Sequence, residues 1–589
     1  MSRTASIYGI NGPLIYLKTD PGFKISEMVY VGAERLVGEV IGLKRGMTTI
    51  QVFEETTGLR PGDIVEGTGA AISVTLGPGI LHNIFDGIQR PLAEIAKNAG
   101  KYITRGVSVD SLDTEKKWDV TMKVRVGDVV HGGTIIAETP ETPAIMHRSM
   151  IPPHIQTATV VSAAPDGAYT VLEPIVTVEL PDGKREEIAL AQKWPIRVPR
   201  PTSKRYPAGK PLITGQRVLD TMFPLAKGGT AAVPGGFGTG KTMTQHSIAK
   251  WSDADIIIYI GCGERGNEMT QVLDDFSKLV DPKSGALMMD RTALIANTSN
   301  MPVAAREASL YSGVTLAEYY RDMGYDVAIM ADSTSRWAEA LRELSGRLEE
   351  MPAEEGFPAY LASRLSTFYE RAGMMLNLNG TEGSVSIIGA VSPQGGDFSE
   401  PVTQNTKRFV RCFWGLDKSL AYSRHFPAIH WLTSYSEYTD DLTAWYRQNV
   451  SPKFMEYRNQ FMTILNQESS LMEIVKLIGS DVLPDDQKLT LEIARVIRLG
   501  FLQQNAFHPE DTCVPLEKQF LMMDTIIYLY EKCRTLVNMG MPVSVLRQQK
   551  IFERVIAIRY DVPNKDLNLF EEYKKEIDAF YEHVLEING

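Results

Sequence analysis

The stretch Gly235-Gly236-Phe237-Gly238-Thr239-Gly240-Lys241-Thr242 decides the fold of this 589-residue chain. It fits the pattern G-x-x-x-x-G-K-[ST], in which a glycine-rich loop holds the phosphates of a nucleoside triphosphate. Glycines let the backbone turn sharply and aim its N–H groups inward, and the N-terminus of a following helix adds positive potential. In this pattern Lys241 reaches the β- and γ-phosphates, and Thr242 offers its hydroxyl to Mg²⁺.

The residues on either side of the loop agree with this interpretation. Residues 231–233 form a short apolar run typical of a buried strand, and residues 243–251 have a pattern typical of a helix. The alternative is a glycine-rich turn that happens to precede a helix. We favour a phosphate loop because strand, loop and helix in this order are the context that the motif requires. The candidate nucleotide contacts are Gly235, Gly236, Phe237, Gly238, Thr239, Gly240, Lys241 and Thr242.

Length and composition narrow the class of protein. A chain of 589 residues is too long for a single core, so several domains are expected. The net charge of −11 argues against a protein whose main task is to bind nucleic acid. The four cysteines are widely spaced, which argues against a disulfide framework or zinc site and fits a reducing compartment. The N-terminus lacks a signal pattern, and no run of about 18 apolar residues exists, so any membrane role would act through partners.

Two parts of the chain are predicted to be rich in strands. Residues 1–72 contain short apolar runs separated by glycine and proline turns, which predicts a small β-barrel. Such barrels often bind oligonucleotides, but few aromatic residues accompany these runs, so we favour a structural barrel. Residues 110–195 predict a compact β-rich insert. Its histidines, His131, His147 and His154, lack the tight spacing of metal ligands, which favours surface or structural roles.

The nucleotide-binding domain is predicted to comprise residues 73–109 and 196–435. Within 73–109, the apolar residues Ile84, Phe85, Ile88 and Leu92 predict a helix. Residues 196–435 alternate strand and helix patterns, which indicates a mainly parallel sheet with helices on both faces. Short β-branched runs predict the buried strands of this sheet, at 231–233, 256–260, 293–296, 327–330 and 385–390.

Residues 436–589 are predicted to be helical. Apolar residues keep helical spacing over 454–465 and again over 471–478, with Gly479 as the expected C-cap. Residues 566–587 predict a further charged amphipathic helix. The simplest interpretation of the apolar stripe is the core of a helical bundle.

Hydrolysis of a triphosphate also requires a carboxylate near the metal. Residues 326–332 form an apolar run that ends in Asp332, which predicts a buried strand with the aspartate at its C-terminal edge. Ligands of open α/β sheets bind at that edge. The alternative for Asp332 is an aspartate that merely begins a loop. The presence of a phosphate loop in the same chain favours a metal-holding role.

A second acidic residue follows a different predicted strand. Glu264 comes directly after the run at 256–260 and could accept a proton from water or orient the water. Arg265 could brace Glu264, contact phosphate or form an ordinary surface salt bridge. Glu268 is interpreted as a solvated helix residue. Residues 392–397 follow another strand, and a plain turn and a place at the same edge are equally good interpretations.

Two aromatic residues, Phe426 and Phe507, could stack on a nucleotide base. Taken by themselves, both are more typical of core packing than of base binding.

Taken together, these motifs resemble those of the catalytic A subunits of V/A-type rotary ATPases. The resemblance extends over nearly the whole chain and is carried by residues 235–242, 261–269, 296–302, 330–337 and 392–401. It implies a multidomain α/β protein with a RecA-like P-loop core, an N-terminal β-barrel, a β-rich insert and a C-terminal helical domain. The insert at 110–195 resembles the extra domain of A subunits, which the homologous B subunits and the F-type catalytic subunits lack.

The resemblance also implies partners. Three A chains would alternate with three homologous B chains in a ring around a central shaft, with peripheral stalk subunits outside. Each nucleotide site would lie at an A–B interface and receive an arginine finger from B. The chain would then work in the cytoplasm, peripheral to the cytoplasmic face of the membrane, and would contact the membrane only through an ion-translocating sector. No nucleic acid partner is implied.

Roles for individual residues follow from the resemblance, with ATP or ADP and Mg²⁺ as the cofactors. Lys241 would bind phosphate, and Thr242 would ligate Mg²⁺. Glu264 would polarise the attacking water, and Arg265 would contact the region of the γ-phosphate. Asp332 would help to hold the metal through water. The resemblance assigns the adenine pocket to Phe426 and Phe507.

The expected function is therefore hydrolysis or synthesis of ATP, coupled by rotation to transport of H⁺ or Na⁺. Eukaryotic vacuolar A subunits have a cysteine where Thr239 stands, which favours a bacterial or archaeal member without their disulfide switch. Two alternatives remain at this point. One is a hexameric P-loop motor that translocates RNA or protein, and the other is a nucleotide-binding subunit without turnover.

Overall fold

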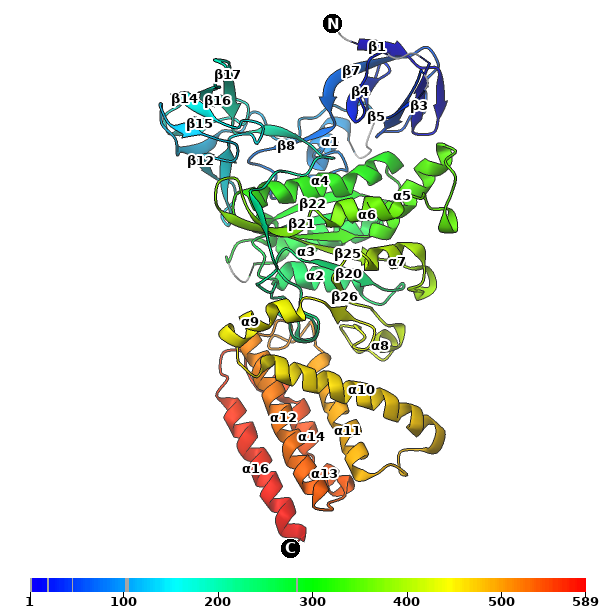
Figure 1. Ribbon diagram of the computed structural model, residues 1–589, viewed down its shortest axis with the longest axis vertical. Helices are drawn as coiled ribbons and strands as arrows, with labels where there is room; N and C mark the ends of the chain where they lie inside the picture. The colour runs from blue at the N-terminus through cyan, green and yellow to red at the C-terminus, as the bar shows by residue number, and fades with distance from the viewer. Residues whose placement is uncertain (1–2, 19–20, 45, 101–104, 282–283, 589) are drawn as a thin grey trace. The chain divides into compact units, whose positions relative to one another are not determined.

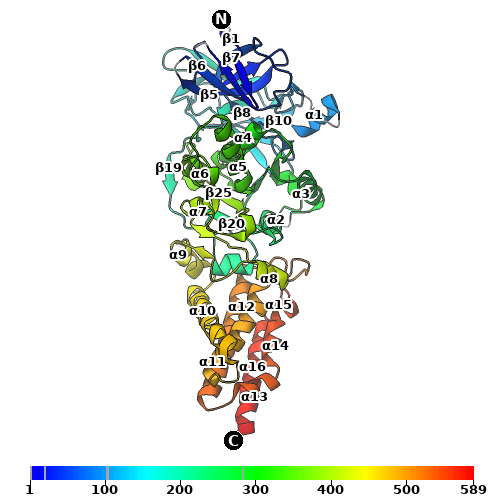
Figure 2. The same cartoon turned by 90° about the vertical axis from the view of Figure 1, so that its right-hand side faces the viewer.

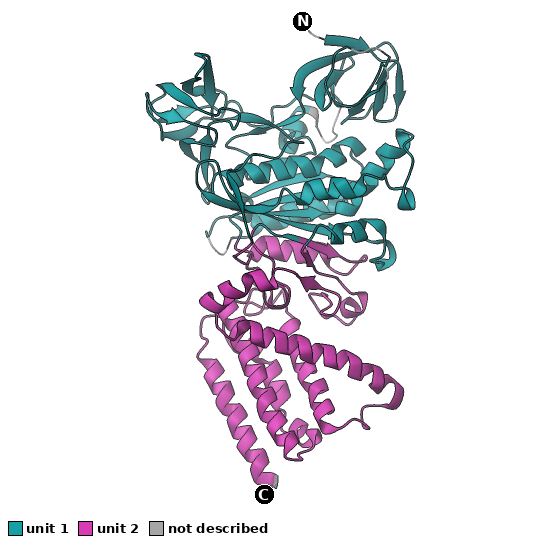
Figure 3. Cartoon of the chain, in the orientation of Figure 1, with its two compact units in different colours: residues 1–207, 228–230, 254–410 teal, residues 208–227, 231–253, 411–589 magenta. Residues whose placement is uncertain are grey.

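The computed structural model describes residues 3–18, 21–44, 46–100, 105–281 and 284–588 (Figure 1). Contacts between Cα atoms divide the chain into two compact units, shown in teal and magenta in Figure 3. The first unit comprises residues 1–207, 228–230 and 254–410, and the second comprises residues 208–227, 231–253 and 411–589. The helical C-terminal part and the glycine-rich loop at 235–242 therefore belong to one unit, and Glu264 and Asp332 belong to the other.

An antiparallel sheet of seven strands forms the N-terminal part of the first unit (Figure 2). Along β4, Val29 and Val31 are fully buried while Met28 and Tyr30 are less so, as the two-residue period of a half-buried strand requires. These valines join an apolar cluster enclosed by the strands. The strand order is β1 (Arg3–Ser6), β7 (Ile64–Ala71), β4 (Glu27–Val31), β5 (Leu36–Lys44), β6 (Met47–Val52), β3 (Leu14–Leu17) and β2 (Gly9–Asn11).

The insert consists of two four-stranded sheets, as its frequent turns predict. One has the order β13 (Met146–Met150), β12 (Ile135–Pro140), β10 (Trp118–Met122) and β15 (Gly167–Tyr169). The other has the order β11 (Val129–Val130), β14 (Ala158–Ala163), β16 (Pro174–Glu179) and β17 (Arg185–Ala189). The chain then returns through β18 (Gln192–Pro195), which pairs with β8 (Ser73–Leu76).

The three histidines of the insert do not form a cluster. His131 and His154 are exposed, whereas His147 is buried beside the hydroxyl of Tyr319. Burial lowers the pKa of His147 to about 3, so this imidazole is neutral and structural. Within the described ranges, no three His, Cys, Asp or Glu side chains are grouped so as to hold a metal ion.

Glu141 anchors the insert to the rest of the first unit. Its carboxylate is buried and accepts hydrogen bonds from the backbone N–H groups of Gly79 and Leu81, each at 3.0 Å. The hydroxyl of Tyr320 donates to the same group at 2.8 Å. Burial raises the pKa of Glu141 to about 6 because the ionised form loses its hydration.

This raised pKa predicts a pH dependence of stability. The folded state holds its proton more tightly than the unfolded state, so the stabilisation is complete below pH 4.5 and is lost as the pH rises through 6. Its size is about 2 kcal/mol. The free energy of unfolding of the wild type relative to that of Glu141→Gln should therefore fall by that amount between pH 4.5 and 7.5, as measured by denaturant unfolding of the full-length chain. A difference that does not vary with pH would contradict this assignment.

A parallel sheet forms the centre of the first unit. Its neighbouring strands are β25 (Glu382–Val391), β23 (Asp326–Asp332), β21 (Ile256–Cys262), β22 (Thr292–Asn297) and β9 (Ile84–Phe85), and every pair is parallel. All seven residues of β21 are buried, which explains its continuous apolar sequence. The flanking helices include α3 (Gly266–Lys278), α4 (Val303–Asp322), α5 (Thr334–Arg347) and α6 (Leu361–Tyr369). The strands predicted at 256–260, 293–296, 327–330 and 385–390 are confirmed.

The helix predicted over residues 84–92 is wrong. Ile84 and Phe85 form strand β9, and the helix α1 (Leu92–Ala99) begins only at Leu92. Between them the carboxylate of Asp86 accepts hydrogen bonds from the backbone of Ile88 and Arg90, which forms a tight turn. The helical spacing of these apolar residues is a coincidence, because Phe85 is buried in the strand whereas Ile84, Ile88 and Leu92 are only partly buried.

The second unit combines a small piece of sheet with many helices. Strand β20 (Thr230–Pro234), which enters this unit at Ala231, pairs in parallel with β26 (Cys412–Phe413), and β26 pairs with β27 (Tyr435–Ser436). Helix α2 (Lys241–Trp251) follows β20. The remaining helices are α8 (Lys418–Tyr422), α9 (Thr439–Asn449), α10 (Phe454–Ile478), α11 (Asp485–Val496), α12 (Leu516–Asn538), α13 (Val543–Gln548), α14 (Ile551–Ile556), α15 (Ile558–Asp561) and α16 (Leu569–Asn588).

Only the first half of the apolar stripe on α10 lies in a core. Phe454, Phe461 and Leu465 are fully buried, whereas Leu477 and Ile478 are 85% and 56% exposed. The expectation that residues 471–478 form part of a bundle core is therefore wrong. Helical spacing places side chains on one face, but it does not supply an element to cover that face. Gly479 ends the helix with φ of 85°, as predicted.

Across the described ranges, no helix combines the length and the apolar character needed to cross a bilayer.

Candidate nucleotide-binding and catalytic residues

The glycine-rich loop of the second unit has the predicted strand–loop–helix arrangement. β20 is buried along its whole length, and α2 begins at Lys241. Gly238 and Gly240 have φ of 78° and 91°, a region that residues with a side chain rarely adopt. A Cβ at Gly235 would lie 2.5 Å from the Thr239 hydroxyl oxygen, so only glycine fits there. The predicted order of strand, glycine-rich loop and helix is confirmed.

Two polar side chains of the loop, those of Lys241 and Thr239, donate hydrogen bonds to the loop's own backbone. The ammonium of Lys241 donates to the carbonyl oxygens of Gly235 at 2.8 Å and Gly236 at 3.1 Å, which holds the cation close to the loop backbone. Thr239 is buried, and its hydroxyl donates to Gly236 O at 2.8 Å. Thr242 lies in the first turn of α2 and is partly buried. Lys241 and Thr242 are therefore the first two residues of the helix that follows the loop.

Phe426 and Phe507 lie on two connected loops of the second unit. A Cβ on Gly240 would lie 3.9 Å from the ring of Phe426, which places this ring next to the glycine-rich loop. Gln504 N donates to Phe426 O at 2.8 Å and links the segment of Phe507 to that of Phe426. The two rings are 43% and 92% exposed, so core packing, which the sequence alone favoured, is wrong for both. An apolar residue type indicates burial on average, but not at a loop whose neighbours leave one side open.

The two predicted carboxylates lie at one edge of the parallel sheet in the first unit. Gly261 pairs with Asp332 across strands β21 and β23, so both strands end at the same level, and Glu264 follows three residues later. Asp332 is buried, and the hydroxyl of Tyr259 donates to its carboxylate at 3.3 Å. The expectation that parallel strand ends bring Glu264 and Asp332 to a common edge is confirmed.

The pKa of Glu264 is raised to about 7. Burial is the main cause, and the negative charges of Asp332 and Glu268 add to it. The positive charge of Arg336 opposes the shift. A carboxylate with a pKa near neutral pH can accept and release a proton at little cost, which is what a general base requires. Glu268 is only partly exposed, and its charge acts on Glu264. It therefore lies closer to this site than the interpretation as a solvated helix residue implied.

Arg336 was not predicted, although it lies in the first part of α5 just after Asp332. Its Cβ lies 2.6 Å from where a Cβ on Gly263 would be, which brings it against the backbone next to Glu264. A sequence signal for it exists, because a helix that starts directly after a buried strand end presents its first turns to that edge. Arg265, in contrast, is exposed at the start of α3, a place that suits both contact with phosphate and an ordinary surface salt bridge.

The segment at 392–397 also lies at this edge. It follows β25, which pairs in parallel with β23, and Ser392 N donates to the Ser335 hydroxyl at 2.8 Å. Asp397 accepts from Ser399, as in a turn. The interpretations as a turn and as an edge segment therefore both hold.

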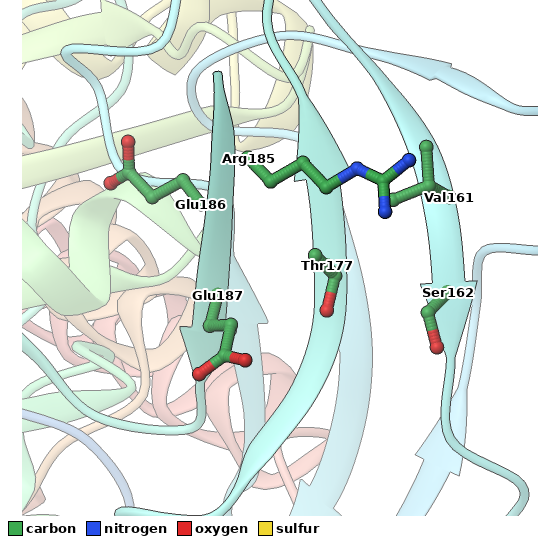
Figure 4. A pocket seen from close by; sticks show the side chains of 6 residues that line it. All are labelled: Val161, Ser162, Thr177, Arg185, Glu186 and Glu187. Atoms are coloured by element: carbon green, nitrogen blue, oxygen red, sulfur yellow. The ribbon is translucent and has the colours of Figure 1, made fainter. Parts of the chain in front are cut away.

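A hollow of about 680 Å³ on the insert offers no second nucleotide site (Figure 4). Figure 4 shows the side chains that line it, which come from β14, β16 and β17 and include Glu186 and Glu187, whose negative charges would repel phosphate. It has no glycine loop and no helix N-terminus. Its lining residues are Val161, Ser162, Thr177, Arg185, Glu186 and Glu187.

Four family models match the chain in sequence order. The "beta-barrel domain" of the ATP synthase alpha/beta family matches residues 7–69, and the "barrel-sandwich domain" of the alpha/beta subunits matches residues 109–197. The "nucleotide-binding domain" of the same family matches residues 215–436. The "C-terminal domain of V and A type ATP synthase" matches residues 443–543. The predicted fold class is confirmed.

Full-length relatives decide the family. The V-type ATP synthase alpha chain of Halothermothrix orenii is 58% identical over 100% of this chain and 99% of its own length. The corresponding A subunit of the A-type ATP synthase of Methanopyrus kandleri is 54% identical over 99% of each chain. The chain belongs to the catalytic A subunits of the V/A-type ATP synthases. These are subunits of ion-translocating rotary enzymes, which couple ATP synthesis or hydrolysis to ion transport.

The family membership sets aside both alternatives. The catalytic A subunits are neither translocases of RNA or protein nor subunits without turnover. The EscN ATPase of the enteropathogenic E. coli type III secretion system superposes with a TM-score of 0.62 over 89% of this chain and 100% of its own. Its sequence is only 20% identical, so it shares the fold with this chain and nothing more is inferred from it.

Proposed function

We propose that this catalytic chain binds Mg²⁺-ATP or Mg²⁺-ADP with the residues described above. The observation that carries the proposal is the strand–loop–helix arrangement at residues 235–242, with positive φ at Gly238 and Gly240 and Lys241 at the start of α2, in a chain of this ATP synthase family. The domains that we propose are the N-terminal β-barrel at 1–72, the nucleotide-binding domain at 73–109 and 196–435, the β-rich insert at 110–195 and the C-terminal helical domain at 436–589.

The loop from Gly235 to Thr242 would bind the phosphates. Its backbone N–H groups and the N-terminus of α2 attract negative charge, and Lys241 adds a full positive charge. Phe426 and Phe507 would hold the adenine by stacking, because both rings are accessible. Phe237 is 86% exposed and would contribute through its backbone.

The strand-end carboxylates would perform the remaining steps. Glu264 would orient water and accept its proton, and Arg265 would contact the γ-phosphate. The Thr242 hydroxyl and the Asp332 carboxylate are oxygen donors, which suit Mg²⁺, and Asp332 would act through a water molecule. The metal, when bound, neutralises charge that develops on the phosphates.

The partners that we propose are three homologous B subunits, which alternate with three A subunits in a ring on the cytoplasmic face of a membrane. Each B partner would supply an arginine that stabilises the charge of the transition state. A central shaft and peripheral stalks would complete the assembly, and rotation would link it to an ion-translocating sector carrying H⁺ or Na⁺.

Native mass spectrometry tests this assembly. When this chain is mixed with its B homologue and Mg²⁺-ADP, the expected mass is that of three chains of each kind. A ring of six copies of this chain alone would contradict the proposed partner and would favour a homomeric motor.

A further inference from the structure

A buried cluster fixes the segment that carries Phe507. Arg217 is fully buried at the start of the π-helical segment η1 (Val218–Met222). Its guanidinium donates to Phe501 O at 2.6 Å, to Asp511 at 2.5 Å and to Gln503 O at 2.7 Å. All three partners lie in residues 501–511, so one guanidinium holds both ends of the Phe507 segment.

Gln504 extends the cluster to Phe426. Its side-chain amide donates to Gly215 O at 2.9 Å and to Asp511 O at 2.8 Å, and its side-chain oxygen accepts from Arg217 N at 2.9 Å. Its backbone N–H donates to Phe426 O. The same buried residue is therefore bonded to the Arg217 backbone, to the Phe507 segment and to the backbone of Phe426.

The cluster continues to Phe507 itself. The second oxygen of the Asp511 carboxylate accepts from Asn505 N at 2.7 Å, and the side chain of Asn505 accepts from Phe507 N at 3.0 Å. An exposed ring gains little orientation from packing, so its position depends on its backbone. The chain of bonds from Arg217 through Asp511 and Asn505 supplies that constraint.

We propose that Arg217, Gln504 and Asp511 are positioning residues for base recognition, which hold Phe426 and Phe507 at the spacing that an adenine ring requires. The inference rests on the proposed assignment of these two aromatic residues. A buried ion pair adds little net stability compared with apolar side chains of similar volume, so stability alone is a weak reason for it here. The planar guanidinium with its fixed fork of donors is instead suited to hold several loop carbonyls in one geometry.

The test compares a ligand that has the base with one that lacks it. Titration calorimetry on the full-length chain would measure the dissociation constants of Mg²⁺-ADP and Mg²⁺-pyrophosphate. In Arg217→Lys and Asp511→Asn the constant for ADP should rise about tenfold, because loss of ring alignment removes base stacking. The constant for pyrophosphate should stay the same, because the phosphate loop is untouched.

Asn505→Ala provides a second variant, since it removes only the cap on Phe507 N and leaves no buried charge unpaired. It should raise the ratio of the dissociation constant of ADP to that of pyrophosphate, as Arg217→Lys and Asp511→Asn do. Arg458→Gln is the matched control, because Arg458 also donates from a partly buried guanidinium to a carbonyl, that of Met222, but touches neither aromatic segment. It should lower the unfolding temperature without changing the ratio.

Phe426→Ala and Phe507→Ala distinguish the proposed adenine pocket from the proposed positioning role. If these variants leave the ADP-to-pyrophosphate ratio unchanged, the base binds elsewhere and the proposed adenine pocket is wrong. If they change it while the Arg217, Asp511 and Asn505 variants do not, the pocket stands and the positioning role is overturned. Equal weakening of ADP binding and pyrophosphate binding in Arg217→Lys and Asn505→Ala would also overturn the positioning role, because it would indicate general damage to the fold.

Discussion

Replacing Glu264 with glutamine is expected to lower steady-state ATP turnover of the reconstituted enzyme by about two to four orders of magnitude, the usual contribution of a positioned general base. Glutamine keeps the size of the side chain and its hydrogen-bond acceptor but cannot take a proton. The pKa of about 7 sets a second expectation, since Glu264 must be ionised to accept a proton. The wild-type rate should therefore rise as the pH increases through about 7. The residual rate of Glu264→Gln should not rise with pH in this range.

Glu268→Gln is the matched control for this experiment. It makes the same chemical change on the same stretch of chain, and Glu268 is one of the charges that raise the pKa of Glu264. Most of the rate should remain, and the rise with pH should move to lower pH. Turnover of Glu264→Gln at the wild-type level would overturn the catalytic assignment.

Replacing Lys241 with alanine is expected to weaken binding of Mg²⁺-ATP by about one to two orders of magnitude, because a charge-assisted hydrogen bond to phosphate is worth about 1.5–3 kcal/mol. The ammonium lies against the carbonyls of Gly235 and Gly236, so its removal takes the only full positive charge from this loop, residues 235–242. Equilibrium binding of a fluorescent ATP analogue would measure the loss. Binding should also become less sensitive to salt, because fewer charges are screened.

Lys250→Ala controls for the loss of charge. Lys250 lies in the last turn of the same helix, where its ammonium sits 4.5 Å from the ring centre of Trp251. Affinity for Mg²⁺-ATP should stay near that of the wild type. Unchanged affinity in Lys241→Ala would mean that the loop binds phosphate through its backbone alone.

Short-range patterns were enough to predict much of this protein. The glycine-rich loop was predicted from eight residues, because the phosphate-binding motif consists of glycines, a lysine and a threonine at fixed spacing. The alternation of buried strands and helices predicted the parallel sheet, and the parallel strands in turn placed Glu264 and Asp332 at one edge. Family resemblance supplied the roles of these residues, which remain proposals.

The errors arose where burial depends on distant parts of the chain. The pattern over 84–92 looked helical, but β22 recruits Ile84 and Phe85 as a strand. The spacing over 471–478 is helical, but no described element covers that face of α10. Phe426 and Phe507 looked like core residues, and both are accessible.

The sequence by itself determined the loop chemistry, the class of fold and the two strand-end carboxylates, because each depends on residues that are neighbours along the chain. Only the tertiary structure decided the raised pKa of Glu264 and the link from Arg217 to residues 501–511. Burial and long-range bonds cause these features, and Arg217 and Asp511 are 294 positions apart. A periodic pattern states which face of an element is apolar, but packing decides what meets that face.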